Sequence, residues 1–159
     1  MRFLIILLFT VFSVNVFSQT DSTKKINPVL QKKYLPDAVN GIYVNISYDD
    51  LLKIRPGIIK DEDASYNSMA HYVEHIDGNN ITGITYQVDD FNIVYEMIFE
   101  YSDSTSHEAL CAMSAKKFGK PNSPDDNMAY QWKVTLNDGL TLMFWVYENK
   151  FCIADASKF

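Results

Sequence analysis

Apolar and polar positions alternate most regularly between positions 91 and 101. Phe91, Ile93, Tyr95, Met97, Phe99 and Tyr101 alternate there with Asn92, Val94, Glu96, Ile98 and Glu100. Successive side chains of a strand point to opposite faces of its sheet. The period of two therefore predicts a strand with one buried face and one amphipathic face, and it is the clearest strand of the chain.

Similar apolar runs, separated by turn residues, predict two groups of three antiparallel strands. The first group covers residues 68–76, 81–88 and 91–101, with bends at residues 77–80 and 89–90. The second covers residues 130–136, 140–147 and 151–155, with turns at residues 137–139 and 148–150. Asp, Asn and Gly dominate these turns, as expected for hairpin connections. A further short strand is expected over residues 42–46.

Two helices are expected, one before each group of strands. Residues 48–55 follow Ser47, which can cap a helix start, and Pro56-Gly57 ends the helix. Residues 106–118 form the second, and Gly119-Lys120-Pro121 ends it. At 100° per residue, one side of this second helix carries Leu110, Cys111, Ser114, Ala115 and Phe118 and should face the sheet.

The two halves share one plan, a helix ended by Gly and Pro and then three antiparallel strands. This plan predicts an α+β fold with one antiparallel sheet of about six strands, built from two helix-plus-three-strand units, and helices packed on one face. Residues 26–40 contain Pro28 and Pro36 and leave room for one short helical turn that packs on the domain.

The repeated segments Leu51-Leu52-Lys53-Ile54-Arg55-Pro56-Gly57 and Ala115-Lys116-Lys117-Phe118-Gly119-Lys120-Pro121, each with its meander, carry a family resemblance. Over residues 47–155 the chain resembles small exported proteins of the β-lactamase-inhibitor-protein-like and outer-membrane-assembly lipoprotein-like group. The resemblance implies a binding or assembly module rather than an enzyme. Lipoproteins of that group carry an acylated Cys after the signal, which is absent here.

The first 18 residues have the three-part pattern of a secretory signal peptide. Arg2 supplies the early positive charge, residues 3–9 form an unbroken apolar run, and Ser18 is a small residue before the polar Gln19. We expect an exported protein, periplasmic or secreted. The expected organisation is a signal peptide over residues 1–18, a flexible lead-in with a short helix over 19–40, and one α+β domain over 41–159.

Charge and hydropathy narrow the kinds of partner. Lys and Arg together number 14 against 20 Asp and Glu, a formal charge of -6. The basic residues are scattered along the chain, so nucleic acid is not an expected partner. After residue 18 no segment approaches the roughly 18 to 20 apolar residues that a membrane helix needs, so we expect no integral membrane segment in the mature chain.

The chain has two cysteines, Cys111 and Cys152. Export to an oxidising compartment makes such a pair a candidate disulfide. The alternative is two buried free thiols that behave as small apolar residues. Cys111 with His107, four positions earlier, also has the spacing of a nucleophile and its base on one helix. Because Cys111 falls on the packing face, we interpret it as structural.

His71-Tyr72-Val73-Glu74-His75 fits the His-x-x-Glu-His pattern of one metallopeptidase class. On a helix His71 and His75 would share a zinc ion with Glu74 as general base. On a strand the two histidines would lie about 13 Å apart and Glu74 would point to the other face. The flanking turn residues favour the strand. We therefore expect no metal and no cofactor, and keep a small zinc-dependent hydrolase as the alternative function.

No phosphate loop, dinucleotide fingerprint, nucleophile elbow or Cys-x-x-Cys occurs in the chain. The remaining candidate for a functional site is one face of the predicted sheet. If the wholly apolar rows of the strands pack under the helices, the open face carries the predicted binding residues Trp145, Tyr147, Met143, Lys133, Glu96 and Glu100, with Gln131 beside them. Aromatic side chains and Met amid mixed charge are typical of protein-binding surfaces. The alternative is that residues 26–39 cover Trp145.

These observations favour a non-enzymatic exported module that binds a protein or peptide in the envelope or outside the cell, as an inhibitor, an immunity-type factor or an assembly factor. A carrier of a small ligand, held in a cleft between sheet and helices, is a third class. No particular residue in the sequence points to it.

Overall fold

The computed structural model describes residues 26–37, 39–66, 69–77, 80–124 and 130–159. The expected signal peptide over residues 1–18 and the lead-in up to residue 25 lie outside these residues. None of the helices in the described ranges is long and apolar enough to cross a membrane.

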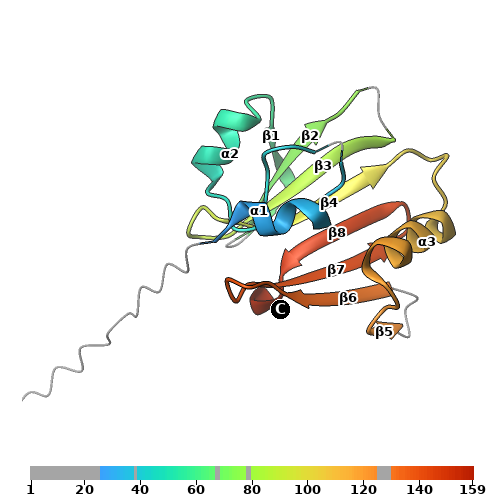
Figure 1. Cartoon of the computed structure of the whole chain (residues 1–159). Helices are drawn as coiled ribbons and strands as arrows, with labels where there is room; N and C mark the ends of the chain where they lie inside the picture. Colours follow the sequence, from blue (N-terminus) through green and yellow to red (C-terminus); the bar gives the residue numbers. More distant parts are fainter. Residues whose placement is uncertain (1–25, 38, 67–68, 78–79, 125–129) are drawn as a thin grey trace, which may run out of the picture.

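The α+β class and the antiparallel sheet are confirmed. The strands are β1 (Ile59–Tyr66), β2 (Met69–His75), β3 (Ile81–Val88), β4 (Val94–Tyr101), β5 (Ser123–Pro124), β6 (Tyr130–Thr135), β7 (Thr141–Tyr147) and β8 (Lys150–Asp155). They form one sheet in the order β1-β2-β3-β4-β8-β7-β6-β5, and every neighbouring pair is antiparallel. The two halves of the chain meet where β4 pairs with β8 (Figure 1).

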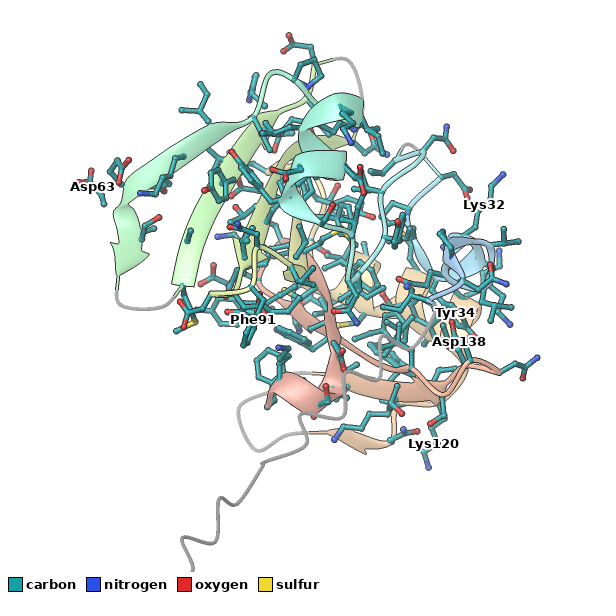
Figure 2. All side chains as sticks on the ribbon, turned by 90° about the vertical axis from the view of Figure 1, so that its left-hand side faces the viewer. Lys32, Tyr34, Asp63, Phe91, Lys120 and Asp138 are labelled. Atoms are coloured by element: carbon teal, nitrogen blue, oxygen red, sulfur yellow. The ribbon has the colours of Figure 1, made fainter. Side chains whose placement is uncertain are left out.

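The expected count of about six strands is too low, because β1 and the two-residue β5 were not expected. Strand β1 has no apolar alternation, since Lys60, Asp61, Glu62 and Asp63 follow one another in it. It lies at the edge of the sheet, where Asp63 stands out into solvent (Figure 2). Charged residues on an edge strand oppose pairing with another chain, which accounts for its composition.

Helices α2 (Tyr48–Ile54) and α3 (His107–Phe118) lie where the sequence predicts them (Figure 1). Ser47 caps α2 by accepting a hydrogen bond of 3.2 Å from the Asp50 amide, and Ser106 caps α3 by accepting one of 3.2 Å from the Ala109 amide. At the end of α3, Gly119 has a φ of 85°, a conformation that favours glycine.

The expected short helix in residues 26–40 is also present, as α1 (Pro28–Gln31) followed by the 3-10 helix η1 (Lys32–Tyr34). Gln31 fixes this segment to the domain. Its side chain is fully buried, accepts a hydrogen bond of 2.9 Å from the Val44 amide and donates one of 3.0 Å to the Val44 carbonyl.

The strand expected over residues 42–46 does not form. Asn45 has a φ of 70°, which interrupts the extended backbone, and the Val44 backbone bonds the Gln31 side chain instead of a neighbouring strand. The Asn45 side chain donates 2.8 Å to a carboxylate oxygen of Asp155 at the end of β8. Asn is among the few residues that tolerate this left-handed conformation.

The core contains buried side chains from the sheet, from α2 and from α3, including Leu51 and Leu110 of the two helices. Figure 2 shows how densely side chains fill the domain. Phe118 of α3 stacks on Phe144 of β7 and Phe151 of β8, with centroids 4.8 and 5.8 Å apart. Tyr34 of η1 packs against Phe144 at 5.5 Å, and Trp132 of β6 is 2% exposed beside Phe118. The alternation predicted for β6 and β7 therefore assigns the apolar face correctly.

Candidate functional site

The face of the sheet opposite this core is the candidate site. Direct pairing across six strands aligns three rows of side chains on it. The middle row is Gln131, Trp145, Cys152, Ile98, Thr85 and Val73; one flanking row is Lys133, Met143, Ala154, Glu96, Gln87 and His71; the other is Tyr147, Lys150, Glu100, Gly83 and His75. We call this surface the open face.

All six predicted binding residues lie on the open face, on strands β4, β6 and β7. Trp145 is half-buried in the middle row, next to the buried Cys152 and the half-buried Ile98. Tyr147 is 54% exposed, and Lys133 and Glu100 are exposed as well. Trp145, Cys152 and Ile98 thus form an apolar band in the middle row, and charged and polar residues lie in the rows on both sides.

Glu96 is the unusual member of this surface. It is only 5% exposed, and no described residue donates a hydrogen bond to its carboxylate. Its neighbours across the strands are Gln87 and Ala154, and the Gln87 oxygen accepts a hydrogen bond of 2.6 Å from the Tyr95 hydroxyl. Burial raises the pKa of Glu96 to about 7. Ionised, it is a poorly solvated anion on this surface.

Cys152, one strand away from Glu96, is buried as well. Burial raises the pKa of its thiol, and the nearby charge of Glu96 adds to this effect. A thiol with a raised pKa is a poor nucleophile at neutral pH. Cys152 therefore contributes apolar surface to the open face rather than reactivity.

Two aromatic residues of this surface, Tyr95 and Phe159, are not among the binding residues that the sequence predicts. Tyr95 was expected on the same face as Met97 and Phe99, but the register shifts between β3 and β4 at Gln87 and Val88. The shift places the Tyr95 ring against Phe159, with centroids 6.3 Å apart. A bulge of this kind leaves no mark in an alternating sequence.

Phe159, rather than residues 26–39, contacts Trp145. The two rings meet edge to face with centroids 5.9 Å apart. The 3-10 helix η2 (Ala156–Lys158) leads the chain there, and Lys158 forms an ion pair of 2.7 Å with Asp89. The alternative that residues 26–39 cover Trp145 is wrong, because Tyr34 of that segment packs on Phe144 in the core instead.

The His-x-x-Glu-His motif lies on strand β2, as the flanking turn residues predicted. Pairing with β3 places His71 and His75 on the open face and Glu74 on the opposite face. There the Glu74 carboxylate accepts 2.7 Å from the Tyr86 hydroxyl and lies 3.4 Å from Arg55. Among the described residues no group of three His, Cys, Asp or Glu side chains could hold a metal ion. The helix that the hydrolase alternative requires is absent.

The disulfide expected as one alternative does not form, and both cysteines are free. Cys152 lies on the open face, opposite Trp145 and Ile98, whereas Cys111 lies on α3 and packs into the core. The sheet separates the two thiols. The spacing of Cys111 and His107 on one helix does bring the pair together, with 3.4 Å between the sulfur and His107 Nε2. Burial raises the pKa of the Cys111 thiol, which agrees with a structural role.

Comparisons with protein families, with characterised proteins and with solved structures find no match for this chain.

Proposed function

We propose that this protein is an exported, non-enzymatic module that binds a protein or peptide through the open face. Inhibition, immunity-type neutralisation and envelope assembly are the roles that this proposal covers. An apolar band through Trp145, flanked by charged residues such as Lys133 and Glu100, has the anatomy of an interface core with a polar rim. We take α2 and α3 to cover only the apolar face, so that a partner would reach the open face beside Phe159, which contacts Trp145.

The largely buried Glu96, whose pKa burial raises to about 7, is the observation that carries the proposal. Removing a carboxylate from water costs free energy, and a cation from a partner would offset that cost. Met143 lies one strand beyond Ala154 in the same row. Trp145, two residues further along the same strand as Met143, lies diagonally across from Ala154. An Arg or Lys side chain from a partner would pair with Glu96, while Met143 and Trp145 would pack on its aliphatic stem. The proposed partner therefore presents a basic side chain flanked by apolar ones.

Export is part of the same proposal, and the pattern of residues 1–18 supports it. The mass of the mature protein, recovered from the periplasm or medium of an expressing bacterium, tests it. Cleavage after Ser18 is the expected result. Recovery of the uncleaved chain in the cytoplasm would contradict export and leave the binding proposal to its own test.

Panning of a phage-displayed random peptide library on the folded protein tests the binding proposal. We expect enriched sequences with Arg or Lys between apolar residues. Synthetic peptides of these sequences should bind the wild type in calorimetry and lose about tenfold or more in affinity to Trp145→Ala and to Glu96→Gln. Val29→Ser, at a 75% exposed position on α1, is the matched control and should bind as the wild type does.

The binding proposal fails on either of two results. The first is that panning enriches no peptide whose binding is saturable. The second is that folded Trp145→Ala and Glu96→Gln keep the wild-type affinity for the enriched peptides.

A further inference from the structure

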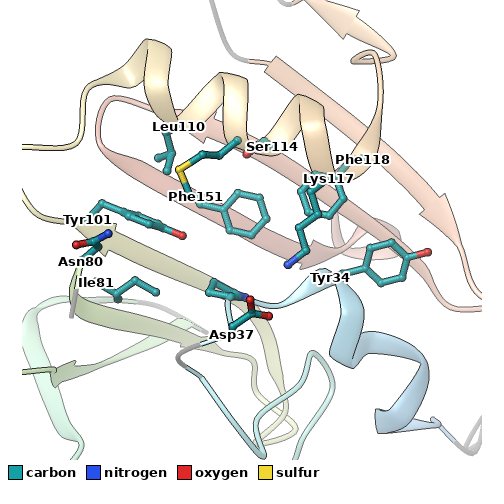
Figure 3. A pocket seen from close by; sticks show the side chains of 12 residues that line it. Tyr34, Asp37, Asn80, Ile81, Tyr101, Leu110, Ser114, Lys117, Phe118 and Phe151 are labelled. Carbon is teal, nitrogen blue, oxygen red and sulfur yellow. The ribbon is translucent and has the colours of Figure 1, made fainter. Parts of the chain in front are cut away.

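A cavity of about 330 Å³ lies on the other side of the sheet, between α3, β4 and the segment after η1 (Figure 3). Its walls are largely apolar and include Ile81, Leu110, Phe118 and Phe151. Sites for small molecules usually range from about 300 to 1,000 Å³ and combine apolar walls with a few convergent polar groups. The size of this cavity is at the lower end of that range, so a small ligand would fill it.

Hydrogen-bond donors converge on this cavity. The Tyr101 hydroxyl and the Lys117 ammonium group extend into it from opposite sides (Figure 3). Tyr101 is 9% exposed and Ser114, on the wall, is 5% exposed, and both residues line the cavity. A hydroxyl that opens onto a cavity can donate a hydrogen bond to a ligand inside it.

Lys117 adds a positively charged group to the lining of this cavity. Its ammonium group donates a hydrogen bond of 2.7 Å to the Leu35 carbonyl, which leaves two of its three N–H groups for other acceptors. Burial lowers the pKa of Lys117, and the nearby Asp37 carboxylate opposes this effect. Asp37 is exposed at the rim of the cavity. An acceptor with negative charge inside the cavity would favour the charged form of Lys117 in the same way.

We propose that this cavity binds a small amphipathic carboxylate. Its carboxylate group accepts hydrogen bonds from Lys117 and Tyr101, and its hydrocarbon part packs on Leu110 and Phe151. At about 30 Å³ for each non-hydrogen atom, the volume of a water molecule in the liquid, the cavity holds about eleven such atoms. This site lies across the sheet from the open face, so it is independent of the proposed peptide binding.

Calorimetric titration with sodium octanoate, which has ten non-hydrogen atoms, tests the proposal. We expect saturable binding of one octanoate per protein. Lys117→Met keeps the apolar stem and removes the charge, and it should weaken octanoate binding about tenfold or more. Lys116→Met changes the preceding position of the same helix, which does not line the cavity, and should bind octanoate as the wild type does. The neutral analogue 1-octanol should bind the wild type and Lys117→Met equally.

Tyr101→Phe is a second variant in case Lys117→Met does not fold. It removes only the hydroxyl, so it should fold normally and still bind octanoate at least threefold more weakly. Absence of saturable octanoate binding to the wild type at millimolar concentration would overturn the proposal. So would equal octanoate affinities of Tyr101→Phe, Lys117→Met and Lys116→Met.

Discussion

The Tyr86 hydroxyl donates a hydrogen bond of 2.7 Å to the Glu74 carboxylate. Arg55, at the end of α2, lies 3.4 Å from the other oxygen of the same carboxylate. Glu74 therefore joins a helix end to two strands, on the face of the sheet opposite His71 and His75. The glutamate of the apparent zinc motif is a structural acceptor in this fold.

Replacement of Glu74 should accordingly reduce stability. In Glu74→Ala the Tyr86 hydroxyl and the Arg55 guanidinium lose their common acceptor, and we expect a loss of about 2 kcal/mol in the free energy of unfolding. Urea denaturation at pH 7 measures it. His75→Ala, at a 79% exposed side chain of the same strand, is the control and should change the value by less than about 0.5 kcal/mol. Equal stabilities of the two variants would contradict this role.

The two cysteines should remain thiols even under oxidising conditions. Because Cys111 and Cys152 lie on opposite sides of the sheet, no disulfide can form between them without unfolding. We expect the protein, purified without reductant, to yield two thiols per chain in urea. In the folded state both should react slowly with a thiol reagent, since burial raises both pKa values. A mass lower by two hydrogen atoms would show that a disulfide had formed.

The sequence predicted the elements whose signals are local. Apolar runs bounded by turn residues identified β2, β3, β4, β6, β7 and β8, and the cap at Ser47 located the start of α2. Prediction from the sequence failed for the segments whose backbone conformation is set by tertiary contacts. Residues 42–46 read as a strand, but Gln31 takes the hydrogen bonds of Val44. Strand β1 was missed because its charged residues reflect its place at the edge of the sheet, which no local pattern encodes.

The same distinction holds for the candidate site. The six predicted binding residues fall on one face, since the side chains of a strand alternate strictly between bulges. The contact of Phe159 with Trp145 depends on how the chain leaves β8, and no periodicity encodes that. The burial of Glu96 likewise depends on its neighbours on β3 and β8. The sequence pattern predicts Glu96 as a surface charge, whereas its 5% exposure raises its pKa to about 7 and makes it a titrating group near neutral pH.

Gln31 should be essential for the attachment of the segment that carries α1. In Gln31→Leu the side chain keeps its approximate size, but the Val44 amide and carbonyl lose their partners in the core. We expect a loss of about 2 to 4 kcal/mol in the free energy of unfolding. Lys32→Leu, at the next and exposed position, should change it by less than about 0.5 kcal/mol. A Gln31→Leu protein as stable as the Lys32→Leu control would contradict this assignment.

Glu96 should make stability fall as pH rises through neutrality. Its folded pKa of about 7 lies above the ordinary value of 4.5, so between these values the folded state keeps a proton that the unfolded state has lost. Stability is therefore greatest below pH 4.5 as far as this group is concerned, and about 3 kcal/mol is lost by pH 8. Glu96→Gln cannot ionise and should be more stable than the wild type at pH 8 by about this amount.

Urea denaturation at pH 5 and pH 8 measures this difference. The control is Glu100→Gln, on the same strand and face but exposed, which should follow the pH dependence of the wild type. Other carboxylates contribute equally to all three proteins, so the contrast between the two variants isolates Glu96. Parallel pH dependences of Glu96→Gln and Glu100→Gln would contradict the raised pKa. They would also remove the argument that Glu96 awaits a cation from a partner, because a carboxylate with an ordinary pKa is already well solvated.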